Sequence, residues 1–136
     1  MVVGMVRPVL LALLAFVTAA AAAAQDLAAG SSWKNRRGSI LRIETVDTSG
    51  AFKGTFEKKG GALGCQGSFD VGGTVVKAHV IFYVTFKNTT RNCNMVTVWR
   101  GSVRGSRLSA RWDLAHTNTK TGRLRFYKGS DVFSRM

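Results

Sequence analysis

The side chains in this sequence that could do chemistry are few. It contains two histidines, His79 and His116, and two cysteines, Cys65 and Cys93. Two histidines are too few and badly spaced for a zinc constellation, so we expect no metal and no cofactor. No serine or cysteine stands in a recognisable catalytic triad context, and the residues therefore give no support for a hydrolase. In an oxidising compartment, a pair of cysteines most often forms one disulfide.

Two hydroxyl groups are more informative because of the residues beside them. Ser39 and Thr97 share an expected strand face with large apolar side chains, Leu41 and Ile43 in one strand and Met95 and Trp99 in the other. A hydroxyl buried among such side chains needs a hydrogen-bond partner, which is another protein group, a water or a ligand. The pattern therefore indicates an interior that is apolar but carries isolated polar groups.

Short alternating runs separated by polar or glycine-containing turns make up nearly all of the chain after Ala24. Helical periodicity is hard to find there, and this spacing is typical of an antiparallel barrel or sandwich. Turns are expected at Arg37-Gly38, 48–50, Gly72-Gly73, 104–106 and Thr121-Gly122. The expected strands are 31–35, 39–47, 51–58, 67–71, 74–87, 95–103, 107–114 and 124–133. Eight strands joined mainly by hairpins predict an all-β, eight-stranded antiparallel up-and-down barrel, which encloses room for side chains or one small ligand.

Alternation also predicts which residues face the interior. The inward sets are Ser39, Leu41 and Ile43; Phe52, Gly54, Phe56 and Lys58; Val80, Phe82, Val84 and Phe86; Met95, Thr97 and Trp99; and Ala110, Trp112 and Leu114. His79 is expected to be an exposed strand residue, and His116 is expected to lie in a loop.

The first 24 residues have the layout of a secretory signal peptide, with Arg7 ahead of an apolar run and alanines before the expected cleavage site. Residues 25–136 are then one secreted or periplasmic domain with no further segment apolar enough to span a membrane. This domain has 19 basic and 7 acidic residues, a formal charge of +12. Such a charge suits a nucleic acid, another anionic polymer or an acidic membrane surface. The basic residues are scattered and form no recognisable nucleic-acid motif, so we favour a solvated basic surface and expect no specific nucleic-acid partner.

Five motifs follow one another between Ser31 and Phe133, at 33–39, 54–57, 86–99, 109–114 and 129–133. Together they resemble the avidin and streptavidin family of biotin-binding proteins. Segments 64–66 and 92–94 are most similar to those of the dimeric bacterial avidins of the rhizavidin type, which implies a bridge between Cys65 and Cys93.

The resemblance implies a role for individual residues. Asn35 and Ser39 match residues that hydrogen-bond the ureido oxygen of biotin, and Asp131 matches the carboxylate that accepts a ureido N–H. Thr97 matches the hydroxyl that meets the ring sulfur. The aromatic cage corresponds to Phe56, Phe86, Trp99 and Trp112. Trp33 matches a structural tryptophan that seals the barrel end.

Several positions depart from the family pattern. Phe56 replaces a tyrosine that donates to the ureido oxygen, and Phe86 replaces the more usual tryptophan. Met95 replaces a serine that contacts the valerate carboxylate, and Lys58 occupies a serine position near the mouth. Residues 115–123 contain no tryptophan, whereas tetrameric avidins use one from this loop in a neighbour's site. This absence agrees with a homodimer.

These departures predict weaker binding than that of streptavidin, whose biotin complex lies near roughly −18 to −21 kcal/mol. Two lost hydrogen bonds at about 1 to 3 kcal/mol each leave about −12 kcal/mol, which is nanomolar. Lys58 could attract the ligand carboxylate, or it could simply extend to solvent. The sequence therefore predicts non-catalytic biotin sequestration. The alternative is an avidin-like barrel that has lost tight biotin binding and takes another small ligand or an anionic polymer.

Overall fold

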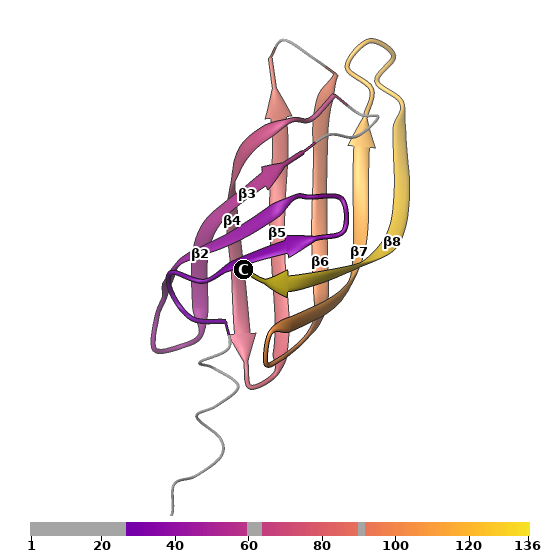
Figure 1. Ribbon diagram of the computed structural model, residues 1–136. Coiled ribbons are helices and arrows are strands. Elements are labelled where there is room, and N and C mark those ends of the chain that lie inside the picture. The colour runs from indigo at the N-terminus through magenta and orange to yellow at the C-terminus, as the bar shows by residue number, and fades with distance from the viewer. Residues whose placement is uncertain (1–26, 60–63, 90–91) are drawn as a thin grey trace, which may run out of the picture.

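Eight antiparallel strands form a closed barrel in sequence order, as the alternation predicted (Figure 1). The computed structural model describes residues 27–59, 64–89 and 92–136. The strands are β1 (Ser32–Asn35), β2 (Ile40–Val46), β3 (Ala51–Lys58), β4 (Gly67–Val76), β5 (His79–Asn88), β6 (Cys93–Arg104), β7 (Arg107–Thr117) and β8 (Leu124–Arg135). The expected signal peptide lies outside the described residues. Within the described part, no helix is long and apolar enough to cross a membrane.

The interior is filled by the predicted alternate side chains. β5 shows the pattern clearly, with exposed and buried residues alternating from His79 to Lys87. His79 is exposed, as expected. One continuous core holds large side chains that are fully buried, and its members include Trp33, Leu41, Phe52, Phe82 and Phe133. Apolar burial on the inward face of the strands, which is least complete along β8, therefore stabilises the closed sheet.

The prediction of a turn at Gly72-Gly73 is wrong, because both glycines lie inside β4. A Cβ atom at Gly73 would lie 2.4 Å from the ring of Phe52, and one at Gly72 would lie 2.9 Å from the Tyr83 hydroxyl. The glycines thus make room for aromatic rings on the two faces of the sheet. The chain turns instead at Lys77, which adopts a positive φ of 55°.

His116 was also wrongly expected in a loop. It lies in β7 and is only 4% exposed. β7 extends three residues beyond the expected end at Leu114, pairing His116 with Arg125 and Thr117 with Leu124. The polar sequence after Leu114 hides this extension, since the ladder hydrogen bonds and not apolar alternation sustain it.

The two ends of the barrel differ because β1 is much shorter than β8. β8 pairs with β1 only through Phe133, Ser134 and Arg135. The half of β8 that begins at Leu124 therefore stands beside β7 without β1 on its other side, at the right of Figure 1. The barrel is closed and packed around Trp33 at one end and wide at the other, where the β7–β8 connection lies.

Candidate binding site

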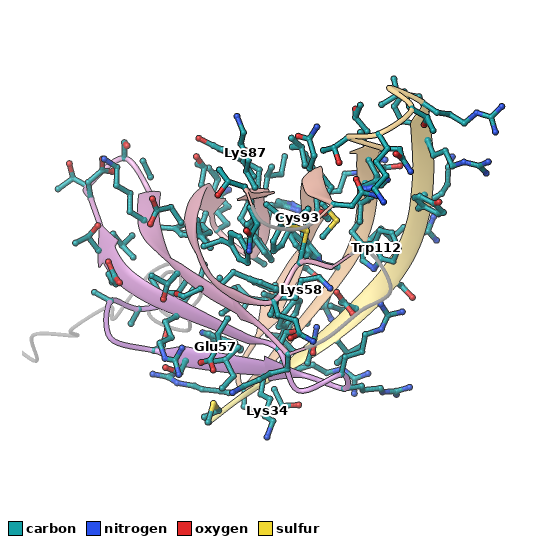
Figure 2. All side chains as sticks on the ribbon, turned by 90° about the horizontal axis from the view of Figure 1, so that it is seen from above. Lys34, Glu57, Lys58, Lys87, Cys93 and Trp112 are labelled. Atoms are coloured by element: carbon teal, nitrogen blue, oxygen red, sulfur yellow. A yellow bond between two sulfur atoms is a disulfide. The ribbon has the colours of Figure 1, made fainter. Side chains whose placement is uncertain are left out.

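A cavity of about 560 Å³ opens at the wide end of the barrel, a size typical of small-molecule sites. Figure 2 looks into this end and shows Lys58 and Trp112 inside the ring of strands, with Lys34 outside it. Ten of the sequence-predicted residues line the cavity: Asn35, Ser39, Phe56, Lys58, Phe86, Met95, Thr97, Trp99, Trp112 and Asp131. Arg37, Lys59, Leu114 and Tyr127 complete the lining.

The aromatic rings at the bottom of the cavity pack against one another. Trp99 stacks on Phe82 at 4.8 Å between ring centroids, and Phe56 lies 5.1 Å from Trp99 on a tilted plane. Phe86 meets Phe56 edge to face at 5.8 Å. Because each ring is held by others, the cage has a fixed shape before any ligand enters.

Asn35 and Ser39 occupy the two ends of the tight β1–β2 loop. The Asn35 Oδ1 accepts the backbone N–H groups of Arg37, at 3.1 Å, and of Ser39, at 2.9 Å. This arrangement fixes the amide orientation, so that Nδ2 is the end of the side chain left to donate. The Ser39 Oγ accepts the Lys59 N–H at 3.4 Å and keeps its own O–H as a donor. Two nearly buried donors therefore lie at one wall of the cavity.

Asp131 in β8 places a carboxylate at the cavity, and Trp99 orients it. The Trp99 Nε1 donates to Oδ2 of Asp131 at 2.9 Å. An ionised carboxylate is an acceptor only, so Asp131 brings acceptor oxygens to a cavity that also holds the Asn35 and Ser39 donors.

Thr97 carries the strongest sign that this cavity holds a ligand. It is 2% exposed, and its Oγ1 is a buried atom without a hydrogen-bond partner among the described residues. Leaving a buried hydroxyl unpaired destabilises a protein by about 1 to 3 kcal/mol. Such a residue is expected where a ligand atom completes the bonding.

Trp112 and Tyr127 form the wall on the β7 and β8 side. Trp112 pairs with Gly129 in the ladder, and a Cβ atom at Gly129 would lie 2.4 Å from the Trp112 ring. The glycine therefore lets the indole lie against β8. Tyr127, which the sequence reasoning missed, shares a strand face with Gly129 and Asp131. Period-two alternation counted back from Asp131 would have found it.

Cationic groups line the rim of the cavity. Glu57 forms ion pairs with Arg42 and Lys59, and the hydrogen bond from Lys59, followed by that from Arg42, lowers the pKa of the Glu57 carboxyl. Burial, followed by the positive charge of Arg37, lowers the pKa of Lys58. Arg37 was missed from the sequence, although it lies between Asn35 and Ser39 in the same loop. The rim thus presents more positive than negative charge to an entering ligand.

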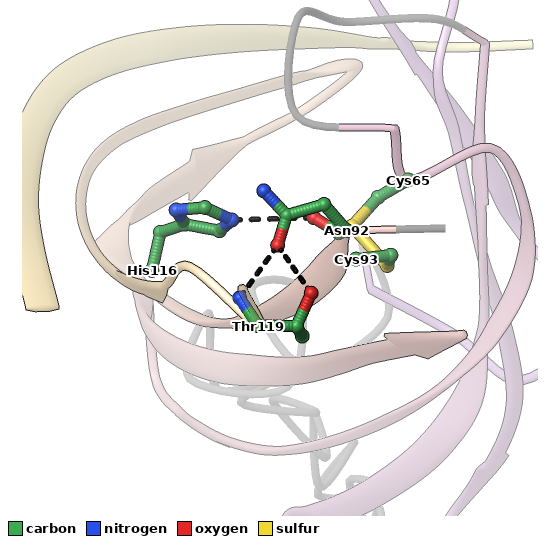
Figure 3. Close-up of a disulfide and its surroundings, with 5 residues drawn as sticks. All are labelled: Cys65, Asn92, Cys93, His116 and Thr119. Carbon is green, nitrogen blue, oxygen red and sulfur yellow. Dashed lines mark hydrogen bonds between the residues drawn. A yellow bond between two sulfur atoms is a disulfide. The ribbon is translucent and has the colours of Figure 1, made fainter. Parts of the chain in front are cut away.

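The disulfide between Cys65 and Cys93, implied by the resemblance, is present and links the start of β6 to the segment before β4 (Figure 3). Asn92, next to Cys93, also reaches the β7–β8 connection. Its Oδ1 accepts the Thr119 N–H at 2.9 Å and the Thr119 hydroxyl at 3.0 Å, and its backbone oxygen accepts His116 Nε2 at 3.2 Å. The cystine and Asn92 together connect three segments around the mouth. Among the described residues, no group of histidine, cysteine and acidic side chains could hold a metal.

The fold and this cavity define a small-molecule-binding β-barrel. Residues 23–136 match the sequence profile of the Avidin family, and the protein belongs to that family. Afifavidin from Afifella pfennigii is 32% identical over 112 residues, which cover 79% of this chain and 69% of the relative.

Solved structures of avidins are also similar to the barrel. The bradavidin2–biotin complex is 37% identical with a TM-score of 0.69, covering 79% of this chain and 97% of that one. The rhizavidin–biotin complex is 30% identical with a TM-score of 0.70, covering 80% of this chain and 92% of that one.

Proposed function

We propose that this protein binds biotin in its open barrel end and sequesters it without catalysing a reaction. The observation that carries the proposal is the polar set in the apolar cavity: two donors at Asn35 and Ser39, the carboxylate of Asp131, and the unpaired hydroxyl of Thr97. A cyclic urea presents one carbonyl acceptor and two N–H donors, which this set complements. Bradavidin2 and rhizavidin, both similar in sequence and structure, have been solved with biotin.

The ureido group is the part of biotin that these residues recognise. In our assignment Asn35 Nδ2 and Ser39 Oγ donate to the ureido oxygen, and Asp131 accepts an N–H from the ring. Hydrogen bonds involving a carboxylate are roughly twice as strong as neutral ones. Thr97 Oγ1 meets the ring sulfur, which gives its buried hydroxyl a partner.

The rest of the cavity receives the apolar part of the ligand. Phe56, Phe86, Trp99 and Trp112 enclose the bicyclic ring, and burial of this ring supplies most of the binding energy. Met95 contacts the valerate chain, and Lys58 with Arg37 attracts its carboxylate at the rim.

Phe56 sets the expected affinity below that of streptavidin, because a phenyl ring cannot donate to the ureido oxygen. The loss of this hydrogen bond and of the hydroxyl at Met95 leaves about −12 kcal/mol, which is nanomolar.

The test is a calorimetric titration of the oxidised protein with biotin, followed in parallel by tryptophan emission. Binding at one biotin per chain, with an emission change from Trp99 and Trp112, supports the proposal. A matched titration with the Asn35→Ala variant should lose most of the affinity. No heat and no emission change, together with steeply salt-dependent binding of heparin or DNA, would favour the anionic-polymer alternative.

We also propose that the protein is exported and forms a homodimer. The disulfide agrees with an oxidising compartment. The outer faces of β5, β6 and β8 expose apolar side chains at Ile81, Tyr83, Val96, Val98 and Phe126. Tyr83 is the ladder partner of Val98, and Val96 is connected to Phe126 through Ala115 of β7. Burial of these apolar side chains against a second copy would remove them from water, so the patch suits a homodimer interface. Light scattering of the Val98→Lys variant tests this, with a monomer expected.

A further inference from the structure

A second cavity, of about 640 Å³, lies beside the first and is lined by Asn92, His116, Asn118, Thr121, Arg123, Arg125 and Tyr127. Only Tyr127 belongs to both cavities. The biotin assignment uses no other residue of this set. No carboxylate is among the lining residues, and neither arginine takes part in an ion pair between described residues. The cavity therefore carries two positive charges that no side chain in its lining offsets.

The hydrogen bonds already made within this cavity occupy the side-chain oxygens of both asparagines. Asn92 Oδ1 accepts two hydrogen bonds from Thr119. Asn118 Oδ1 accepts the N–H groups of Lys120, at 2.9 Å, and Thr121, at 3.1 Å. The Thr121 Oγ1 accepts the Arg123 N–H at 3.3 Å.

Apart from the hydroxyl oxygens and the second ring nitrogen of His116, the polar side-chain groups that these bonds leave over are donors. Each asparagine has its Nδ2 amide hydrogens left to donate, Thr121 and Tyr127 have their O–H groups, and the two guanidinium groups can only donate. His116 already gives its Nε2 hydrogen to the Asn92 carbonyl and is buried below the others. A cavity with two positive charges and mainly donor groups suits a ligand that is anionic and only accepts.

We propose that this second cavity binds a small phosphate oxyanion. Guanidinium groups match the oxygens of a phosphate in a two-pronged geometry, and the amide and hydroxyl donors can reach the remaining oxygens. The cavity is larger than a single phosphate needs, so two linked phosphates fill it better than one. Asn92 is held in a fixed position among these lining residues, because it binds Thr119 and is adjacent to the disulfide-bonded Cys93.

Pyrophosphate titrated into the full-length oxidised protein, followed by calorimetry at fixed ionic strength, tests the site. One ion per chain should bind, and Arg123→Gln and Arg125→Gln should each weaken binding about tenfold, as expected for a charge-assisted hydrogen bond. The matched control is Arg111→Gln, which removes the same charge from the exposed outer face of β7. It should change the affinity less than about twofold, because an exposed distant charge is largely screened.

Two further arms locate the ion and identify its source. Arg37→Gln, at the rim of the first cavity, should leave pyrophosphate binding unchanged, and the Nδ2 amide signals of Asn92 and Asn118 should shift on binding. An equal loss in Arg37→Gln or in Arg111→Gln would overturn the proposal, because the ion would then lie in the first cavity or be held by net charge alone. Binding of oligothymidylate with no response to pyrophosphate would overturn it in favour of a nucleic-acid backbone. None of these outcomes depends on biotin binding.

Discussion

Replacement of Thr97 by valine should make the protein more stable and a poorer binder at the same time. Valine has nearly the same shape as threonine but lacks the hydroxyl. The Thr97 Oγ1 is buried and unpaired, and the residue is 2% exposed. Removing an unsatisfied buried hydroxyl should stabilise the free protein by about 1 to 3 kcal/mol. At roughly 4 °C per kcal/mol, the melting temperature should rise by about 4 to 12 °C.

The same substitution removes the hydrogen bond assigned to the biotin sulfur. A neutral hydrogen bond contributes about 0.5 to 1.5 kcal/mol, so the affinity should fall by about 2- to 12-fold. Scanning calorimetry of the free protein and titration calorimetry with biotin measure the two effects. The matched control is Thr85→Val on the exposed face of β5, which should change neither quantity appreciably. A lower melting temperature for Thr97→Val would show that the hydroxyl is satisfied within the protein and refute the reasoning.

Four other changes test separate parts of the site. Asp131→Asn removes the charge of the acceptor assigned to the ureido group and should weaken biotin binding by tenfold or more. The hydrogen bond from Trp99 should persist, so the unfolding free energy should stay nearly constant. An unchanged affinity in calorimetry would exclude the assigned role. Phe56→Tyr should restore a donor and tighten binding about tenfold, seen as slower biotin dissociation in a stopped-flow chase, and a faster off-rate would count against it. Lys58→Met should weaken the affinity for free biotin about fivefold but leave the affinity for an amide-linked biotin unchanged. Because the pKa of Lys58 is lowered, the wild-type preference for the free acid should disappear as the pH rises, before the ordinary titration range of lysine is reached. Equal wild-type affinities for both ligands at neutral pH would contradict the role assigned to Lys58. The Cys65–Cys93 disulfide has a sequence separation of 28. Its reduction should lower the unfolding free energy by about 3 to 4 kcal/mol in the chain-entropy model. Urea denaturation with and without reductant measures this difference, and coincident unfolding curves would contradict it.

The alternation of side chains determined most of this fold. Inward and outward positions along a strand follow from a period of two, so the buried residues from Val80 to Phe86 could be identified without coordinates. The same rule placed Phe56 and Thr97 inside the barrel. The motifs shared with the avidins then indicated which inward residues belong to one site.

The tertiary structure decided the features that depend on neighbours distant in sequence. Gly72 and Gly73 look like a turn in the sequence, and only the rings of Phe52 and Tyr83 packed over them show why they are glycine. His116 looked like a loop residue until its strand partner Arg125 was known.

The tertiary structure also decided that the Thr97 hydroxyl is unpaired among the described residues and that a second cavity exists. Both depend on which atoms from several strands and loops meet in space, and a strand pattern records only the direction in which each side chain points. Local alternation thus specified the faces of the strands, while the packing between them specified what those faces can bind.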